Sequence, residues 1–241
     1  MFTVEKLDRL TADQLQAALP GAIIGRESIV LEQTGSTNDA ILQVASPQRA
    51  ALSSPPSLVN EGLVLFAEHQ TAGRGQRGNR WESTARKGLW FSILLRPHIQ
   101  LRDSGRLTIW VIETISDVVR TEFGLEPMIK LPNDVQLCGR KVAGVLVEMR
   151  AQENAPHLAV VGIGINVNQS RDDFPMELQD RAISLAMELG RQVDRQKFAV
   201  AILRTLDLTY REKFSSGVAA VKSSPVATTT RDKRMAKFRK A

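Results

Sequence analysis

The sequence has very little cysteine, which excludes two classes of protein. Cys138 is the single cysteine among 241 residues. One cysteine cannot form an intrachain disulfide and cannot supply the ligands of a cysteine-rich zinc site. Long apolar runs are also missing, because the longest have about seven residues and a membrane-spanning helix needs about 20. We therefore expect a cytoplasmic protein that does not cross a membrane.

The first 221 residues have no net charge, because they contain equal numbers of acidic and basic residues. The formal net charge of +6 arises from Lys222 onward, where seven basic residues accompany one acid, Asp232. Because residues 1–221 carry no net positive charge, they give little evidence of a surface that binds nucleic acid, so we expect no DNA partner. The serines, threonines and proline among these basic residues predict a disordered basic tail over residues 216–241. Residues 1–215 are then a single folded domain.

The apolar spacing predicts a fold in which strands with short connections alternate with inserted helices. The apolar content of 43% and charged content of 24% are ordinary for a globular chain. Ser36 or Thr37 is suited to begin a helix, and residues 46–60, with three prolines, are typical of a loop. Helices are predicted over residues 2–19, 107–123, 182–189 and 196–214, and strands over 28–33, 63–68, 89–95, 128–131, 135–137, 142–149 and 158–163. This order predicts an α+β protein with a mixed, largely antiparallel sheet flanked by helices.

Glycine and arginine dominate residues 70–81, which read QTAGRGQRGNRW and lie between two predicted strands. Glycine lets the backbone approach a ligand and point its N–H groups inward. The guanidinium groups of Arg74, Arg77 and Arg80 suit carboxylate or phosphate oxygens. The composition predicts an anion-binding loop, and a solvated basic loop fits it equally well. The pattern matches neither a P-loop nor a dinucleotide-binding turn.

Three more polar clusters follow predicted strands, where functional loops concentrate. They are GSTN at 35–38, KLPND at 130–134 with GRKVAGVLVE at 139–148, and GIGINVN at 162–168. Lys141 begins an apolar strand, so its ammonium either reaches water, as lysines usually do, or binds an anion. Asp134 either belongs to a simple turn or holds Mg²⁺.

The four clusters, in this order, closely resemble the catalytic domain of bacterial biotin protein ligases. The resemblance runs from about residue 27 to residue 214 and includes STN, Gln70, GRGQRG followed by Trp81, K-x-PND, GRKVAGVLVE and GIGINVN. It implies the fold that this family shares with class II aminoacyl-tRNA synthetases. It also implies two reactions, in which biotin and ATP give biotinyl-5′-AMP and pyrophosphate and the biotinyl group is then transferred to a lysine of a biotin carboxyl carrier domain.

The same resemblance assigns roles to individual residues. Arg74 and Lys141 are catalytic, because they offset the repulsion between a carboxylate and a phosphate in a water-poor site. Biotin is bound by Ser36, Thr37, Asn38, Gln70, Gly73, Arg74, Gly75, Gln76, Lys141, Gly144 and Gly164. ATP is bound by Arg77, Trp81, Lys130, Asn133 and Asn166, with Trp81 stacked on the adenine, and Asp134 holds Mg²⁺.

The sequence departs from the family pattern in several places. Leu131 stands where the family usually has tryptophan, and Gln76 stands where many members have a further arginine. We find no segment typical of a DNA-binding domain or of the family's C-terminal β-barrel. Without a segment typical of a DNA-binding domain, we expect no repressor role. The resemblance leaves open whether the protein forms a homodimer. Three other functions remain: a lipoate or octanoate transferase, a non-catalytic binder of biotin or its adenylate, and a nucleic-acid binder acting through the tail.

Overall fold

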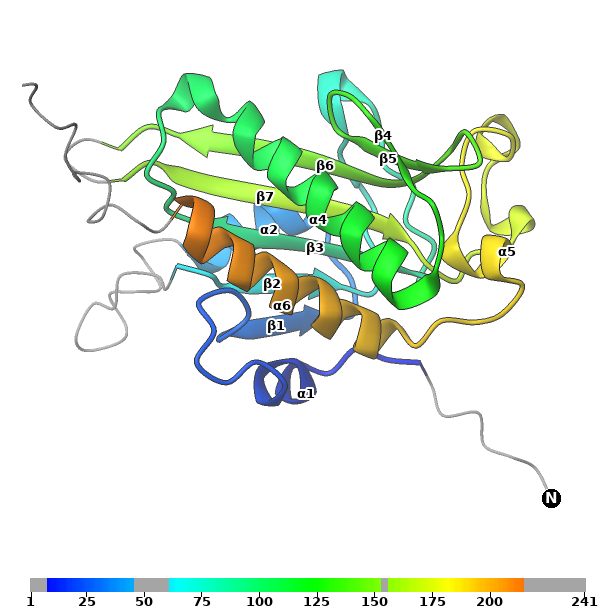
Figure 1. Cartoon of the computed structure of the whole chain (residues 1–241), viewed down its shortest axis with the longest axis horizontal. Coiled ribbons are helices and arrows are strands. Elements are labelled where there is room, and N and C mark those ends of the chain that lie inside the picture. The colour runs from blue at the N-terminus through cyan, green and yellow to red at the C-terminus, as the bar shows by residue number, and fades with distance from the viewer. Residues whose placement is uncertain (1–7, 46–60, 153–155, 215–241) are drawn as a thin grey trace, which may run out of the picture.

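The fold is built on one seven-stranded sheet with helices on both faces (Figure 1). The computed structural model describes residues 8–45, 61–152 and 156–214. In spatial order the strands are β1 (Ser28–Leu31), β2 (Val64–Ala67), β3 (Gly88–Leu95), β7 (Leu158–Asn166), β6 (Arg140–Arg150), β5 (Asp134–Leu137) and β4 (Met128–Lys130). Strands β1 and β2 are parallel and the other neighbouring pairs are antiparallel. The predicted mixed, largely antiparallel sheet is confirmed.

The helices divide unequally between the two faces of the sheet. Helices α4 (Gly105–Phe123) and α6 (Arg195–Phe214) cover one face, and α2 (Thr37–Val44) packs on β2, β3 and β7 from behind (Figure 1). Short helices α1 (Ala12–Ala17) and α5 (Leu185–Leu189) lie at the edges. The 3-10 turns are η1 (Gln76–Gly78), η2 (Leu101–Asp103), η3 (Arg171–Asp173) and η4 (Met176–Leu178). No helix in the described ranges is both long and apolar enough to cross a membrane.

Strand β3 shows why the sheet is buried on both sides. Leu89, Phe91 and Ile93 belong to the main core beneath α4 and α6, whereas Leu94 packs with Ile41 of α2. Every residue of β3 is buried. A strand covered on both faces is typically a continuous apolar run, and the sequence of β3 has that form. Ser92 is the polar exception, and it faces the candidate site.

Two predicted helices are shorter in the structure. The helix predicted over residues 2–19 is observed only as α1, and residues 1–7 lie outside the described part. Ahead of α1 the backbone is extended, because Leu10 N donates to Glu68 (2.9 Å) and Thr11 N donates to Gln196 (2.9 Å). The helix predicted from Ala182 begins only at Leu185, since the hydroxyl of Ser184 caps it. The loop predicted over residues 46–60 and the tail predicted over residues 216–241 also lie outside the described part.

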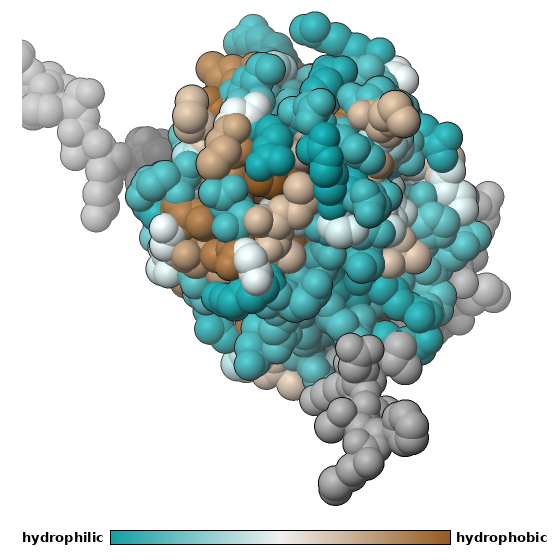
Figure 2. All heavy atoms as spheres, turned by 90° about the vertical axis from the view of Figure 1, so that its right-hand side faces the viewer, coloured by the Kyte–Doolittle hydropathy of each residue, from teal (hydrophilic) through white to brown (hydrophobic). Residues whose placement is uncertain are grey.

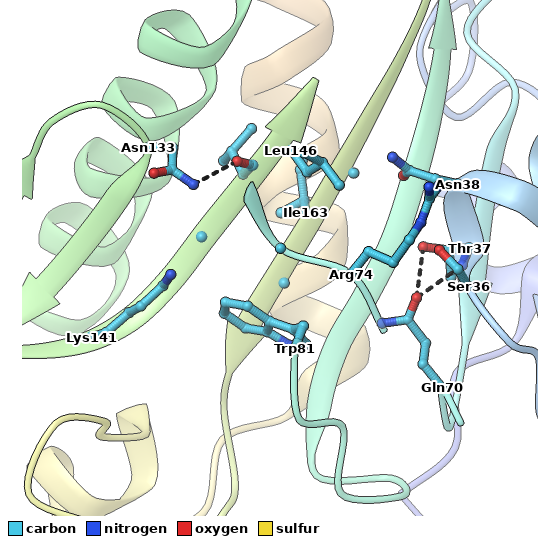
Figure 3. Close-up of a pocket in the computed structure, with 15 residues that line it drawn as sticks. Ser36, Thr37, Asn38, Gln70, Arg74, Trp81, Asn133, Lys141, Leu146 and Ile163 are labelled. Carbon is cyan, nitrogen blue, oxygen red and sulfur yellow. Dashed lines mark hydrogen bonds between the residues drawn. The ribbon is translucent and has the colours of Figure 1, made fainter. Parts of the chain in front are cut away.

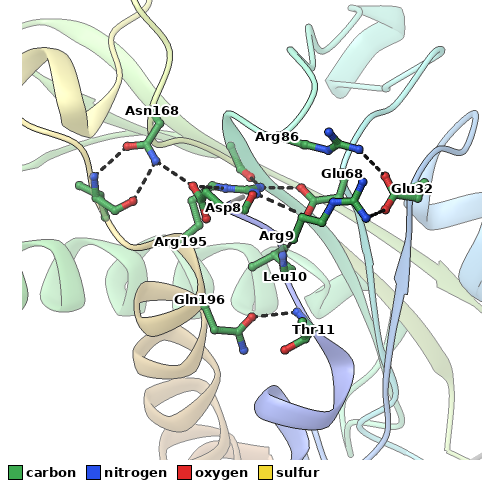
Figure 4. A network of polar contacts seen from close by, with 12 residues as sticks. Asp8, Arg9, Leu10, Thr11, Glu32, Glu68, Arg86, Asn168, Arg195 and Gln196 are labelled. Carbon is green, nitrogen blue, oxygen red and sulfur yellow. Dashed lines mark hydrogen bonds and ion pairs between the residues drawn. The ribbon is translucent and has the colours of Figure 1, made fainter. Parts of the chain in front are cut away.

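A buried arginine ties the N-terminal segment to the sheet (Figure 4). Arg195 is fully buried and donates to Glu68 at 2.7 Å and to Asp8 at 2.9 Å. It also donates to the carbonyl of Gly88 at 3.1 Å, where β3 begins. Asn168 donates to the same Asp8 carboxylate at 3.3 Å. Arg195 therefore joins the ends of two strands to the chain before α1, close to the start of the glycine- and arginine-rich loop.

Candidate active site

On the sheet face that carries α2, a patch of β6 and β7 has no side chains, because it is formed by Gly144, Gly162 and Gly164. We call this patch the floor of the site. Gly144 of β6 lies opposite Gly164 of β7, and Gly164 lies opposite Trp90 of β3. Two residues along the strands, and therefore on the same face, Gly162 lies opposite Ser92. A β-carbon at Gly162 would approach Asn38 Oδ1 to 2.3 Å, so this glycine makes room for α2. The floor thus follows from the strand register together with the glycines.

A buried polar network forms one end of the site (Figure 3). Gln70 Oε1 accepts from the N–H of Thr37 at 2.9 Å and from its hydroxyl at 3.2 Å. Gln70 therefore satisfies the first N–H of α2, and no side-chain cap is seen at Ser36. The hydroxyl of Ser92 donates to Oδ1 of Asn38 at 2.6 Å and lies 2.8 Å from the hydroxyl of Thr37, and Ser83 accepts from Gln70 at 3.2 Å. The network supplies oriented donors and acceptors for a polar ligand.

The glycine- and arginine-rich loop folds back on itself and reaches over the floor. Trp81 N donates to the carbonyl of Gly73 at 2.9 Å, and the backbones of Arg74 and Arg80 pair as an isolated antiparallel β-bridge. The guanidinium of Arg74 binds Asp39 at 2.8 Å and Glu148 at 3.0 Å. Arg74 is thus held by carboxylates of α2 and β6.

Lys141 faces the site from β6 and is held by two partners. Its ammonium binds Asp134 Oδ1 at 2.7 Å and lies 5.1 Å from the centre of the Trp81 ring. The Trp81 indole in turn lies on Gly144 and Gly164, because a β-carbon at Gly144 would approach Trp81 to 2.8 Å. Lys130, a further cation predicted for the site, lies on the exposed edge strand β4.

These elements line a narrow cavity of about 40 Å³. Arg74 of the glycine- and arginine-rich loop, Lys141 of β6 and Gly164 of β7 all line it, so three segments distant in sequence converge there. The other predicted site residues in its wall are Ser36, Thr37, Asn38, Gln70, Gly75, Trp81, Asn133 and Gly144. Asn133 donates to the carbonyl of Val145 at 2.9 Å. The cavity is narrow because the indole of Trp81 rests on its floor.

A second, wider cavity of about 470 Å³ adjoins the first and shares Trp81 and Lys141 with it. Lys130, Asp134 and Asn166 line it, as do residues of the segment between β7 and α5. Figure 2 shows the side of the molecule on which α5 lies, where brown apolar side chains gather among hydrophilic ones. Exposed apolar residues near this cavity include Met128, Ile129, Leu131 and Met176.

Some predicted site residues are not brought into either cavity. Gln76 and Arg77 lie in the η1 turn, and Gly73 is buried against the carbonyl of Trp81 within the loop. Arg77 has a φ of 57°, the left-handed region. Their contacts with a ligand stay predictions, and each requires the loop to move.

Asn166 has a structural role that the sequence did not indicate. It is buried, and its amide donates to the carbonyl of Ile183 at 3.1 Å and to that of Lys141 at 3.3 Å. Asn166 thereby fixes the segment before α5 against β6. Phe174, Leu178 and Arg181 also line the second cavity, and the sequence did not indicate them because their segment has no recognisable motif. Arg80 of the glycine- and arginine-rich loop lines it too, although no ligand contact was predicted for it.

The described residues contain no group of three or more His, Cys, Asp and Glu side chains suited to a metal ion. A protein cage for a resident metal is therefore not seen in those ranges. Asp134 offers a single carboxylate at the junction of the two cavities. Mg²⁺ in nucleotide sites is commonly held by one or two carboxylates together with substrate phosphates, so Asp134 is compatible with that arrangement.

Comparison with known proteins is consistent with this geometry. Residues 40–166 match the model of the biotin/lipoate A/B protein ligase family. The biotin–[acetyl-CoA-carboxylase] ligase of Mycobacterium tuberculosis is 35% identical over 210 residues, which is 83% of this chain and 72% of that protein. The bifunctional ligase/repressor BirA of Bacillus spizizenii is 32% identical over 219 residues, which is 91% of this chain. The match spans only 64% of the length of the Bacillus protein.

A solved structure shows the same fold. The biotin protein ligase of Aquifex aeolicus in complex with biotin and ATP superposes with a TM-score of 0.60 and 31% sequence identity. The similarity covers 78% of this chain and 73% of that one. It confirms the fold that the resemblance implied. From the matched family model, the identity with the Mycobacterium relative and this common fold, we conclude that the chain belongs to the biotin/lipoate A/B protein ligase family.

Proposed function

We propose that this protein is a biotin–protein ligase, which activates biotin with ATP and transfers it to a lysine of a biotin carboxyl carrier domain. One observation carries the proposal: Arg74, Lys141 and the Gln70–Thr37 network line a single cavity. That cavity joins a second one at Lys141, which gives room for two substrates to meet. The names of the Mycobacterium and Aquifex relatives support biotin as the acid and ATP as the nucleotide.

In the first reaction, a carboxylate oxygen of biotin attacks the α-phosphorus of ATP. The bond from that phosphorus to the bridging oxygen breaks, and pyrophosphate leaves with the electron pair. Two anions must approach each other, so fixed cations lower the barrier. Lys141 is placed for this role where the cavities join, and Arg74 is placed at the rim of the narrow one.

Both cations must exchange partners before they can act. Lys141 is paired with Asp134 (2.7 Å), and Arg74 with Asp39 and Glu148 (2.8 and 3.0 Å). A biotin carboxylate would replace Asp134 as the partner of Lys141. The Asp134 carboxylate would then be available for Mg²⁺, which when bound neutralises phosphate charge. Mg²⁺ at Asp134 is part of the proposal.

In the second reaction, the amine of the acceptor lysine attacks the carbonyl carbon of the adenylate. The bond from that carbon to the phosphate oxygen breaks, AMP leaves, and the amine loses a proton. No histidine lines either cavity, and the carboxylates of Glu82, Asp134 and Asp180 that line the second one are each paired with a cation. We infer that positioning beside an activated acyl group supplies most of the rate.

The exposed apolar residues near the second cavity support contact with a partner domain. Leu131 is 67% exposed and Met176 is 86% exposed. Apolar side chains near the cavity mouth suit an acceptor that must present its lysine there. A homodimer, the absence of a DNA partner and a cytoplasmic location stay predictions from the sequence.

A direct assay tests the proposal. The protein is mixed with biotin, Mg-ATP and a biotin carboxyl carrier domain, and the acceptor mass is measured. We expect one biotinyl group on the acceptor, and none on a variant whose target lysine is arginine. Parallel reactions with lipoate and octanoate test transfer of those acids. Failure with biotin, on an acceptor that another biotin ligase modifies, would contradict the proposal.

A non-catalytic biotin binder gives a different result. Calorimetry would then detect biotin binding, while no pyrophosphate would appear when ATP is added. The two outcomes are separated by measuring binding and pyrophosphate release on the same preparation.

A further inference from the structure

Glu148 of β6 lines neither cavity, yet it contacts two residues in the wall of the narrow one. Its Oε2 atom accepts from the amide of Asn38 at 2.6 Å and from the guanidinium of Arg74 at 3.0 Å. Asn38 belongs to α2 and Arg74 to the glycine- and arginine-rich loop, so one oxygen joins two segments that are distant in sequence. Figure 3 shows the Arg74 side chain extending toward Asn38. Glu148 is therefore placed to hold the loop against α2 and the sheet.

The Asn38 amide is held in one orientation, which in turn fixes the Glu148 carboxylate. Asn38 is buried, and its Oδ1 accepts from the hydroxyl of Ser92 at 2.6 Å. Because Oδ1 faces Ser92, the amide NH₂ group faces Glu148 and donates to it. Gly162 leaves room for this amide on the floor. Glu148 thus receives a hydrogen bond from a buried donor in addition to its ion pair with Arg74.

Asp39 is the second carboxylate on Arg74, and it is more accessible to solvent. It binds the same Nη2 atom at 2.8 Å, but its side chain is 56% exposed, against 35% for Glu148. A ligand anion that reaches Arg74 can replace the exposed Asp39 while Glu148, fixed by Asn38, keeps its contact. We propose that Glu148 is a positioning residue that keeps Arg74, and with it the loop, at the rim of the narrow cavity. The inference rests on the proposed function only for the identity of that ligand, biotin.

Glu148→Gln tests the role without a change of shape. The glutamine oxygen can still accept from Asn38, but the charge that holds Arg74 is gone. Trypsin cuts after Arg77 and Arg80 of the loop when the loop opens, and mass spectrometry measures the rate with no substrate added. Because native-state proteolysis follows the population of the open form, the loop of Glu148→Gln should be cut about fivefold faster than that of the unaltered chain.

Asp39→Asn is the matched control, because Asp39 pairs with the same guanidinium nitrogen. It should change the rate of loop cleavage by less than about twofold. Cleavage after Arg191, an exposed residue between α5 and α6, reports general unfolding and should be equal in all three chains.

The second readout is the kinetics of biotin-dependent pyrophosphate release. Glu148 acts through Arg74, and saturating biotin draws the loop closed again. Glu148→Gln should therefore raise the KM for biotin about fivefold and change kcat by less than about twofold. Asp39→Asn should keep both constants within about twofold of the unaltered chain.

Four results would overturn the inference. They are equal loop cleavage in Glu148→Gln and the unaltered chain, equal acceleration in Asp39→Asn, equal acceleration at Arg191, and a fall in kcat at unchanged KM. The last would place Glu148 in the chemical step. If Glu148→Gln is cut faster in the loop alone but the unaltered chain releases no pyrophosphate, the proposed function fails and the positioning role stands.

Discussion

The indole of Trp81 lies directly on Gly164. A β-carbon at Gly164 would stand 2.4 Å from Cε2 of the indole, a distance that real β-carbons do not reach. Gly144, across the strand pair, is equally crowded by Trp81 at 2.8 Å. Glycines in a ligand site are usually explained by the room that they leave for a ligand. These two leave room for a side chain of the protein itself.

Ligand binding should therefore change the surroundings of Trp81. A ligand in the narrow cavity must share or take over the floor, so the ring has to shift. The chain has three tryptophans, at 81, 90 and 110, and the difference between the unaltered chain and Trp81→Phe isolates the emission of Trp81. We expect biotin with ATP to alter this difference spectrum. An unchanged difference spectrum at saturation would show that the ring stays in place.

Gly164→Ala should displace Trp81 without any ligand. The added methyl group has no space, so the ring leaves the floor and its emission shifts to the red as water reaches it. Overpacking of this kind typically costs about 1–3 kcal/mol of unfolding free energy. Gly105→Ala is the control, because a β-carbon at Gly105 meets nothing within 4 Å. A Trp81 spectrum that is the same in Gly164→Ala and Gly105→Ala would contradict the packing described here.

Arg195→Met should destabilise the fold strongly. It leaves the buried carboxylate of Glu68, 2% exposed, without its cation. Removing one partner of a buried ion pair typically costs about 3–5 kcal/mol. Urea unfolding measures the loss, and Arg195→Met with Glu68→Gln should recover part of it.

An exposed ion pair provides the comparison for Arg195. Arg120 binds Asp117 on the surface of α4 at 2.9 Å, and Arg120→Met should cost less than about 1 kcal/mol. Equal losses for the two arginine variants would mean that the buried network contributes no more than a surface pair.

Asp173 should make stability depend on acid pH. Burial alone would raise the pKa of its carboxyl, but hydrogen bonds from Ser170 N–H and Oγ and the charge of Lys87 outweigh it and lower the pKa. The unfolded reference pKa is about 3.9, so the contribution is complete above that value and is lost as the pH falls through the folded pKa. The unfolding free energies of the unaltered chain and Asp173→Asn should converge below about pH 4. A pH-independent difference between the two would contradict this assignment.

The sequence predicts the sheet well because its strands are apolar runs bounded by turn residues. The run at 89–95 differs from the observed β3 (Gly88–Leu95) by one residue. Arg74, Lys141 and Gly164, which come from three separate motifs, line the narrow cavity together, and their roles toward a ligand stay predictions. The strands are predicted well because their pattern lies in short stretches of chain.

The sequence cannot reveal relationships that arise only after folding. That Asp134 and Asp39 hold Lys141 and Arg74 depends on distances across the sheet. Asn166 stands in a recognisable motif, yet its amide secures a distant segment through backbone carbonyls. Arg181 belongs to no motif, and only the packing of its segment against β6 brings it to the cavity.

The most direct test of the account is biotin-dependent release of pyrophosphate from Mg-ATP. The unaltered chain should release pyrophosphate only when biotin is present. Lys141→Ala should lower that rate by at least about a hundredfold, because it removes the cation where carboxylate and phosphate meet. Lys197→Ala, which changes a lysine side chain that is 86% exposed, should match the unaltered chain. Near-normal release by a folded Lys141→Ala protein would contradict the central role given to Lys141.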